Sequence, residues 1–203
     1  MHIIETRRAP NPRRVAIFLA EKGIEVPREE RDLMAGDLRS AAFSELNPWQ
    51  RVPVLVLDDG RTISESVAIC RYFEELHPTP ALFGTGAFGR AEVEMWNRRV
   101  ELGLFNAVAS VFRHLHPKMA HLETPQIASW GEANRNKIGV ELARLDHHLA
   151  GQTFIVGDHY SIADITTLVA IDFMKPAGVA KPENYANVAR WYAAVSARPS
   201  ASA

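Results

Sequence analysis

The chain has little cysteine, no excess of either charge and no long hydrophobic run. Its 203 residues include one cysteine, which cannot form an internal disulfide or a four-cysteine zinc site and is typical of a reducing compartment. The 23 basic and 24 acidic residues leave a net charge of −1, so no global field attracts nucleic acid or anionic lipid. No apolar run approaches the roughly 20 residues of a membrane helix, and Glu5, Arg7 and Arg8 interrupt any signal-peptide pattern. We therefore expect a cytoplasmic protein with no nucleic-acid or membrane partner.

The composition is that of an ordinary globular protein, with 47% hydrophobic and 23% charged residues. The first eighty residues contain both strand and helix patterns of apolar residues, whereas the remainder contains only the helix pattern. Strands are predicted over 2–6, 24–26, 52–57 and 62–64, and helices over 12–22, 41–46, 66–76, 87–115, 125–150, 161–174 and 184–197. The order β-α-β-α-β-β-α followed by helices predicts an α+β domain over 1–80, a linker over 81–88 and an all-α domain over 89–203.

Capping residues mark the ends of several predicted helices. Asn11 precedes Pro12, which suits the first turn of a helix, so Asn11 is the predicted N-cap, and Gly23 ends the same helix. Ser161 and Asp164 have the spacing of a reciprocal capping box. This second pair is a folding device without chemistry of its own.

Three weak motifs are more simply explained by structure than by chemistry. The GxGxxG string over 84–89 resembles a nucleotide-binding turn, but prolines stand where the preceding strand should be, so a flexible linker is expected. His114 and His116 would lie on different sides of a helix, which favours solvated side chains over a metal site, and no metal is expected. Cys70 falls between apolar neighbours and is expected in the core.

A stronger constellation combines three features. Pro53 near the start of a strand cannot donate to the sheet, so this strand end lies at a sheet edge or ends the pairing. A cis bond there would turn the preceding backbone N–H and C=O outward, where they can pair with an extended peptide. Glu65 and Ser66 lie where a strand meets a helix, a place suited to a carboxylate and an ammonium group. Asn11 begins a helix among Arg7, Arg8, Arg13 and Arg14. Each feature alone has a structural explanation (an edge proline, a capping serine, solvated arginines), but together they predict a site for a small zwitterionic peptide.

At these residues the sequence resembles the cytosolic glutathione transferases of bacterial type. The similar segments are 9–23, 47–55, 63–69 and 154–165, in the family's order and spacing. The resemblance implies a thioredoxin-like N-terminal domain, an all-helical C-terminal domain, a homodimer, and glutathione as the cosubstrate that is conjugated to small apolar electrophiles. It also implies an acceptor pocket between the domains, lined by part of 104–114.

The resemblance assigns roles to individual residues of the predicted peptide site. By the family's pattern Val52, before a cis Pro53, pairs with the cysteinyl backbone of glutathione. Glu65 and Ser66 hold the γ-glutamyl end. The glycyl carboxylate is met by a basic or amide side chain, for which Arg51, Gln50 and Arg39 are the candidates.

The sequence departs from the family at the residue that meets the sulfur. Where a serine is expected stands Ala9, and no Tyr or Cys precedes Cys70. We expect the Asn11 amide to stabilise the thiolate. The yeast Gtt2-like branch, which the sequence resembles, uses a water held by the long helix, and there Asn106, Ser110 or His114 would hold it. The Ala9 substitution keeps open a non-catalytic ligand-binding or interaction protein, and a glutathione-dependent peroxidase or dehalogenase is a further alternative.

Overall fold

A computed structural model describes residues 1–7 and 9–203 of the chain. The chain forms two compact units, one of Met1–Leu82 together with Pro199–Ala203 and the other of Phe83–Arg198. Arg8, one of the four arginines of the predicted site, lies outside the described residues. The domain ranges 1–80, 81–88 and 89–203 stay a prediction.

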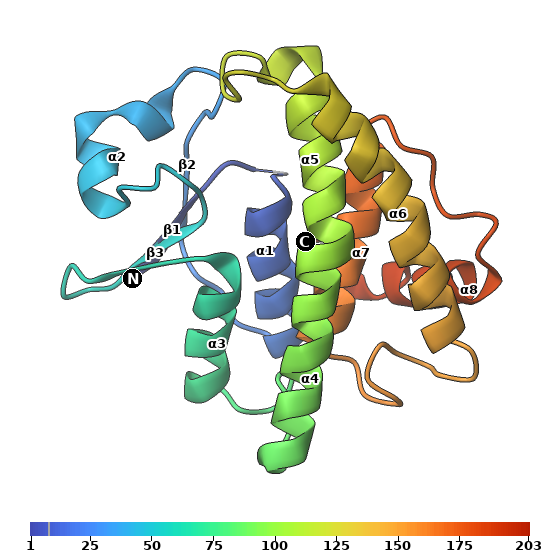
Figure 1. Ribbon diagram of the computed structural model, residues 1–203. Helices are drawn as coiled ribbons and strands as arrows, with labels where there is room; N and C mark the ends of the chain where they lie inside the picture. The colour runs from blue at the N-terminus through green and yellow to red at the C-terminus, as the bar shows by residue number, and fades with distance from the viewer. Residues whose placement is uncertain (8) are drawn as a thin grey trace. The chain divides into compact units, whose positions relative to one another are not determined.

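The first unit is built on a four-stranded mixed sheet (Figure 1). The strands β1 (His2–Glu5), β2 (Arg28–Glu30), β3 (Val54–Val56) and β4 (Thr62–Ser64) lie in the order β2-β1-β3-β4. β1 runs parallel to β2 and antiparallel to β3, which pairs with β4 in a hairpin. The helices are α1 (Pro10–Lys22), α2 (Ala41–Leu46) and α3 (Ser66–Leu76). This order confirms the predicted thioredoxin-like βαβαββα domain.

Apolar side chains of the central strands and of α1 and α3 form the core of this unit. Ile3 and Leu55 are fully buried, as are Phe18 of α1 and Ile69 of α3. Burying each such side chain contributes about 1.5–3 kcal/mol. The α1 and α3 helices pack against each other along their length, and this packing sets the position of both helix N-termini.

The start of α1 differs from the prediction. The N-cap is Ala9 and the helix begins at Pro10, so Asn11 lies in the first turn. The fixed φ of proline suits the first helical position, and Pro12 also falls among the first four residues, whose N–H groups have no partner within the helix. The predicted end is confirmed, because Gly23 has the left-handed φ of 64°.

The second strand was also predicted in the wrong place. The weak apolar signal over 24–26 does not form a strand, and β2 consists of the charged residues Arg28–Glu30. As an edge strand, β2 is only partly covered and has no apolar alternation by which the sequence would reveal it.

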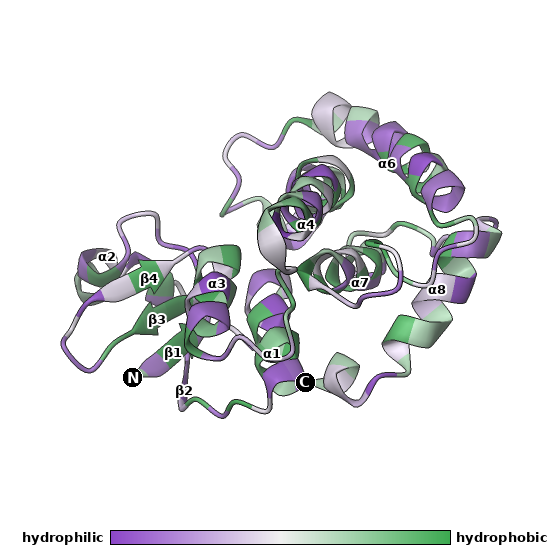
Figure 2. Ribbon diagram, turned by 90° about the horizontal axis from the view of Figure 1, so that it is seen from below, coloured by the Kyte–Doolittle hydropathy of each residue, from purple (hydrophilic) through white to green (hydrophobic). Residues whose placement is uncertain are grey.

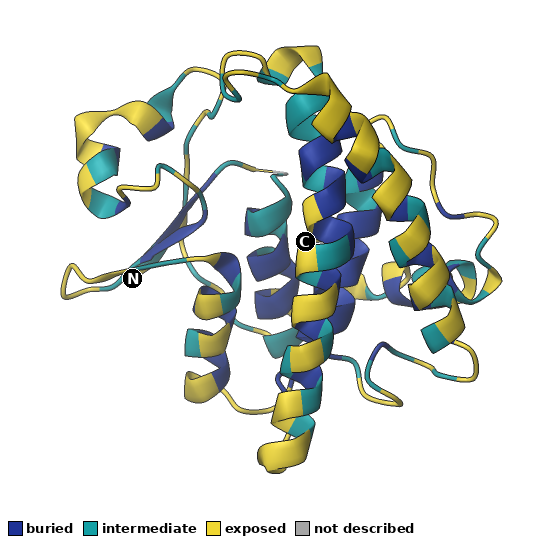
Figure 3. Cartoon of the chain, viewed as in Figure 1, coloured by how far each residue is buried: buried dark blue, intermediate teal, exposed yellow. Residues whose placement is uncertain are grey.

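The second unit is a bundle of helices in which α7 (Ile162–Met174) is buried on nearly every side (Figure 3). In Figure 2 α4 (Gly86–Val100), α6 (Ala128–His148) and α8 (Ala186–Ser196) lie around α7. The α5 helix (Asn106–Leu115) also packs against α7. The predicted helix over 87–115 is one continuous column in Figure 1, but it contains a π-helical segment, Glu101–Phe105, between α4 and α5. No helix in the described part of the chain combines the length and apolarity needed to cross a bilayer.

The predicted capping box is confirmed at the start of α7. The Ser161 side chain accepts from a backbone N–H of the first turn, and the Asp164 carboxylate accepts from the Ser161 N–H at 2.9 Å. Asp164 is completely buried and also accepts from Ile155 N and Trp191 Nε1, both at 2.9 Å. One carboxylate therefore joins α7 to the preceding loop and to α8.

Gly84 and Thr85 of the glycine string lead directly into α4, and residues 86–89 are the first turn of that helix. The flexible linker stays a prediction. Gly84 has a φ of 78°, and a Cβ there would lie 2.5 Å from the carbonyl oxygen of Gly89. Only glycine fits so close an approach of backbone to backbone. The string therefore shapes the entry into α4.

Candidate active site

The N-termini of α1 and α3 meet in the first unit, although 55 residues separate them in sequence. Ser66, the first residue of α3, is buried, with its Oγ 3.5 Å from Oδ1 of Asn11. Nη1 of Arg14, one turn further along α1, donates to the same Ser66 Oγ at 3.0 Å. Two helix N-termini and a guanidinium favour an anion at this place.

Glu65 lies beside Ser66 at the start of α3. It is the N-cap of α3 with a φ of 70° and a ψ of 114°, a conformation that a non-glycine residue seldom adopts. Glu65 is exposed while Ser66, next in the chain, is buried. A hydroxyl donor and a carboxylate thus stand side by side, as recognition of a zwitterionic group requires.

The Val52–Pro53 peptide bond is cis. The β1–β3 ladder extends as far as the pair Ile4 and Val54, so Val52 lies beyond the end of that ladder. Val52 is half-buried, whereas Pro53 is buried. The structure places this backbone at the edge of the pairing region, in the same unit as Ser66 and Asn11.

Asn47 holds the loop that carries the predicted binding residues, a role that the sequence analysis missed. Its buried Nδ2 donates to the carbonyl of Arg51 at 2.8 Å, and its Oδ1 accepts from Trp49 N at 3.2 Å. The Asn-Pro pair after α2 is the available signal, because asparagine side chains commonly hold turns through their own backbone neighbours.

The three residues predicted to meet the glycyl carboxylate, Arg39, Gln50 and Arg51, differ in their surroundings. Arg39 and Arg51 are exposed, Arg39 at the end of a 3₁₀ turn, Asp37–Arg39, and Arg51 in the loop before β3. Gln50 has a φ of 53°, and its Nε2 donates to Ser44 Oγ at 3.0 Å. One hydrogen of the Gln50 amide is therefore already engaged inside the first unit.

The candidate water-holding residues lie on α5 in the second unit. Ser110 and His114 are one turn apart, and both are largely covered, whereas Asn106 is exposed. Nδ1 of His114 accepts from Ile127 N at 3.1 Å, and its Nε2 lies 3.9 Å from Glu123 Oε1. The expectation of a solvated side chain is wrong for His114, whose ring fixes the loop before α6 and has Nε2 left for other partners.

Cys70 is a core residue, as the sequence predicted. Its side chain is fully buried on α3. Burial raises the pKa of the Cys70 thiol well above its ordinary value, and the charge of Arg14 offsets only part of this effect. Cys70 is thus protonated at neutral pH and has no thiolate for chemistry.

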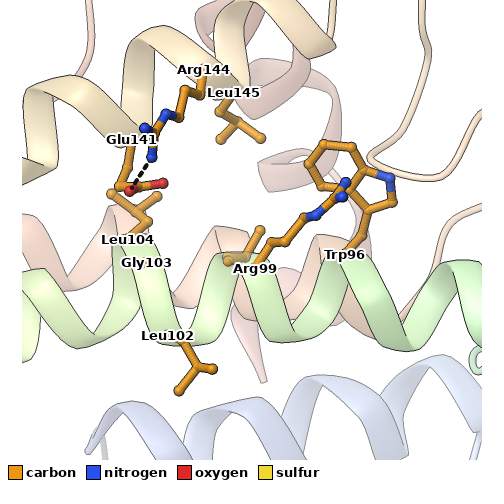
Figure 4. Close-up of a pocket in the computed structure, with 9 residues that line it drawn as sticks. Trp96, Arg99, Leu102, Gly103, Leu104, Glu141, Arg144 and Leu145 are labelled. Carbon is orange, nitrogen blue, oxygen red and sulfur yellow. Dashed lines mark hydrogen bonds and ion pairs between the residues drawn. The ribbon is translucent and has the colours of Figure 1, made fainter.

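The second unit contains a cavity of about 450 Å³ between α4, the π-helical segment and α6 (Figure 4). Arg99 lies over the Trp96 ring, with its guanidinium carbon 4.7 Å from the centroid, and Arg144 donates to Glu141 at 3.0 Å. A Cβ on Gly103 would lie 2.9 Å from Glu141 Oε2, so glycine lets this carboxylate approach the π-helical segment. The lining consists of Trp96, Arg99, Val100, Leu102, Gly103, Leu104, Glu141, Arg144 and Leu145.

Only Leu104 in this lining belongs to the stretch 104–114 that was predicted to border the acceptor. The predicted acceptor pocket therefore stays a prediction. Among residues 1–7 and 9–203, no group of three or more His, Cys, Asp and Glu is placed to hold a metal ion.

A thioredoxin-like sheet domain followed by a helical domain is the architecture of the glutathione transferases. The family model "Glutathione S-transferase, N-terminal domain" matches residues 9–76, and "Glutathione S-transferase, C-terminal domain" matches residues 114–199. The chain belongs to the glutathione S-transferase family of enzymes, as its sequence motifs predicted.

The relatives also confirm the resemblance to the Gtt2-like branch. The chain is 34% identical to glutathione S-transferase 2 of Saccharomyces cerevisiae over 98% of its own length and 87% of that protein. The crystal structure of Saccharomyces cerevisiae Gtt2 matches with a TM-score of 0.94 and 33% identity, over 100% of this chain and 99% of the other. A class Gtt2 glutathione S-transferase of Vibrio parahaemolyticus matches with a TM-score of 0.86 and 39% identity, over 98% and 95%.

Proposed function

We propose that the protein conjugates the thiolate of glutathione to small apolar electrophiles, a reaction of the detoxification type. The observation that carries this proposal is the meeting of the α1 and α3 N-termini at Asn11, Arg14 and Ser66. Such a site suits a peptide that bears both a carboxylate and a thiolate, because each anion gains from a helix N-terminus.

The binding residues are proposed from this geometry and from the family's pattern. The γ-glutamyl carboxylate binds the Ser66 hydroxyl and the N-terminus of α3, and the γ-glutamyl ammonium binds Glu65. The cysteinyl backbone pairs with Val52 beside Pro53. Because Gln50 already donates to Ser44, we assign the glycyl carboxylate first to Arg51, with Gln50 and Arg39 as supporting donors.

The free energies involved allow Asn11 to replace the missing serine. Lowering a thiol pKa of about 8.5 by two units requires about 2.7 kcal/mol of selective stabilisation of the thiolate. A helix N-terminus supplies about 0.3–1 kcal/mol, and up to about 2 when partly buried. One hydrogen bond to a charged group adds about 1.5–3 kcal/mol. The sum for the Asn11 amide and the first turn of α1, about 2–4 kcal/mol, is of the size required. Ser110 and His114 Nε2 are the alternative holders of a catalytic water.

The test measures both binding and turnover. Calorimetry with glutathione and the absorbance change on conjugation of chlorodinitrobenzene should show binding and activity in the unmodified protein. We expect Asn11→Ala to raise the apparent pKa of the bound thiol, read from thiolate absorbance against pH, by about one unit, and to lower kcat/KM about tenfold.

Ser110→Ala and His114→Ala are the matched variants for this test. Activity lost in these two but kept in Asn11→Ala would move the thiolate-stabilising role from Asn11 to α5. An unmodified protein that neither binds glutathione nor conjugates the electrophile would contradict the proposal. Binding without turnover would instead favour the non-catalytic role that Ala9 suggests, and Asn11→Ala would then have no effect on function.

We also propose that the protein acts in the cytoplasm as a homodimer. Its single cysteine, which is buried and unpaired with another cysteine, suits a reducing compartment, and the family usually dimerises. Sedimentation equilibrium should give a mass twice the 22.6 kDa of one chain; a single-chain mass at micromolar concentration would contradict the dimer.

A further inference from the structure

Arg14 is a buried arginine at the interface of α1 and α3. Its side chain is among the largest fully buried ones in the described chain, with 1% of its surface exposed. A guanidinium is rarely buried without a specific purpose, because removing its charge from water costs several kcal/mol. The Arg14 Nη1 donates to Ser66 Oγ at 3.0 Å, so this buried charge reaches the first residue of α3.

The bond from Arg14 determines whether the Ser66 hydroxyl donates or accepts on its other side. A guanidinium only donates, so Ser66 Oγ must be the acceptor in its bond with Arg14. A serine hydroxyl has one hydrogen, which is then available on the side away from Arg14. The acceptor on that side is Asn11 Oδ1, which lies 3.5 Å from Ser66 Oγ, an oxygen–oxygen distance at the long limit for a hydrogen bond. Ser66 thus accepts from the core and donates toward the surface.

We propose that Arg14 is a positioning residue for glutathione, and this inference rests on the proposed function. By occupying a lone pair of Ser66 Oγ, Arg14 fixes the hydroxyl as a donor to the γ-glutamyl carboxylate. The long bond to Asn11 is exchanged for a charge-assisted one when the carboxylate arrives. Without Arg14 the hydroxyl rotates freely and turns its hydrogen toward the ligand only part of the time.

This exchange of hydrogen bonds at Ser66 connects the γ-glutamyl position of the proposed site to the sulfur position at Asn11. While Ser66 donates to Asn11 Oδ1, the Asn11 amide is held toward α3. When the carboxylate takes the Ser66 hydrogen, the amide is released to turn its Nδ2 hydrogens toward the sulfur. Occupation of the γ-glutamyl position thereby frees the thiolate donor.

The experiment is a double-mutant cycle read with two ligands. Calorimetry would measure the Kd of glutathione and of γ-aminobutyryl-cysteinyl-glycine, which lacks the γ-glutamyl carboxylate, for the unmodified protein, Arg14→Met, Ser66→Ala and the double variant. We expect each single variant to weaken glutathione about tenfold, which corresponds to about 1.4 kcal/mol. The double variant should be no more than about twofold weaker than Ser66→Ala, because Arg14 acts through Ser66. Neither Arg14→Met nor Ser66→Ala should alter the Kd of the analogue by more than about twofold.

Lys22→Met is the matched control. Lys22 Nζ pairs with Glu74 Oε2 at 2.5 Å at the same interface of α1 and α3, but at the far end of α1. This variant removes a covered cation from the interface without touching Ser66, so the Kd of both ligands should stay unchanged even if the melting temperature falls. Should Arg14→Met fail to fold, Arg14→Lys keeps a cation and a donor, and a smaller loss confined to glutathione is expected.

Two results would overturn this inference. Losses of Arg14→Met and Ser66→Ala that multiply to about a hundredfold would show that the two residues act independently. An equal loss with the analogue would show that Arg14 supports the fold and not the carboxylate. Failure of the unmodified protein to bind glutathione would instead overturn the proposed function itself, so the two failures are distinguishable.

Discussion

At the scale of single residues, Asp164 shows how burial changes the effect of a charge. Burial raises the pKa of this carboxyl to about 6, although hydrogen bonds from Ile155, Trp191 and Ser161 each lower it. In an unfolded chain an aspartate has a pKa of about 3.9. The folded protein therefore binds a proton between about pH 4 and 6 that the unfolded chain has already lost.

The sign of the pH dependence follows from this difference. Because the folded state holds more protons in that window, the contribution of Asp164 to the free energy of unfolding falls as pH rises. A shift of about two units corresponds to about 3 kcal/mol. We predict that the difference in free energy of unfolding between the unmodified protein and Asp164→Asn shrinks by about this amount from pH 4 to pH 7, measured by urea denaturation.

Asp59→Asn provides a comparison, because the contribution of Asp59 to the free energy of unfolding changes with pH in the opposite direction. The hydrogen bond from Arg61 lowers the pKa of the Asp59 carboxyl in an exposed turn. The small contribution of Asp59 is thus present above its unfolded pKa and lost as pH falls. A stability difference for Asp164→Asn that stays constant or grows from pH 4 to pH 7 would contradict the prediction.

At the scale of elements, two glycines of α6 stand in opposite surroundings. A Cβ on Gly131 would lie 2.6 Å from Leu115 Cγ, whereas a Cβ on Gly139 would have the Tyr185 hydroxyl 3.9 Å away as its nearest neighbour. Gly131 therefore permits the close approach of α6 to α5, whereas half-buried Gly139 has room for a methyl group. Both positions are helical, so backbone preference is the same at each.

Alanine at these two positions should change stability in opposite directions. Gly131→Ala must displace Leu115 or separate the helices, and overpacking of this kind costs about 1–3 kcal/mol. Gly139→Ala gains helix propensity of up to about 1 kcal/mol. Urea denaturation followed by circular dichroism should show a lower midpoint for the first variant and an equal or higher one for the second. Equal midpoints for the two would refute the packing argument.

At the scale of the whole molecule, the chain begins and ends in the same unit. The residues Pro199–Ala203 belong with the sheet domain, although the bundle precedes them in sequence. Ser200 is buried and its hydroxyl donates to the Glu21 carboxylate on α1, while Arg13 Nη2 donates to the carbonyl of Ala201 at 2.9 Å. The last residues thus stabilise the helix that carries Asn11.

Serine substitutions in this segment test that contribution. Ser200→Ala leaves the Glu21 carboxylate without this donor and should lower the free energy of unfolding by about 1.5–3 kcal/mol. Ser202→Ala is the control, because the Ser202 hydroxyl is exposed and bonds only locally to the Pro199 carbonyl; its effect should stay within about 0.5 kcal/mol. Equal effects of the two variants would show that the bond from Ser200 to Glu21 adds no stability of its own.

The sequence was most informative where one local rule decides the structure. The capping box of Ser161 and Asp164, the stop at Gly23 and the helix Ser66–Leu76 were all predictable, because each depends on residues close together in the chain. The order of elements and the family motifs predicted the fold class for the same reason. The edge strand β2 escaped prediction, since its residues are charged and its identity comes from pairing with β1.

The sequence alone determined the family, the thioredoxin-like and helical domains, and the residue types available for a peptide ligand. Tertiary structure decided which of them meet. Asn11 and Ser66 come from different helices, and Arg14, at first one of several basic residues, is the one buried against Ser66. Local preferences depend on neighbours in the chain, whereas the direction of a hydroxyl hydrogen depends on packing between helices that are distant in sequence.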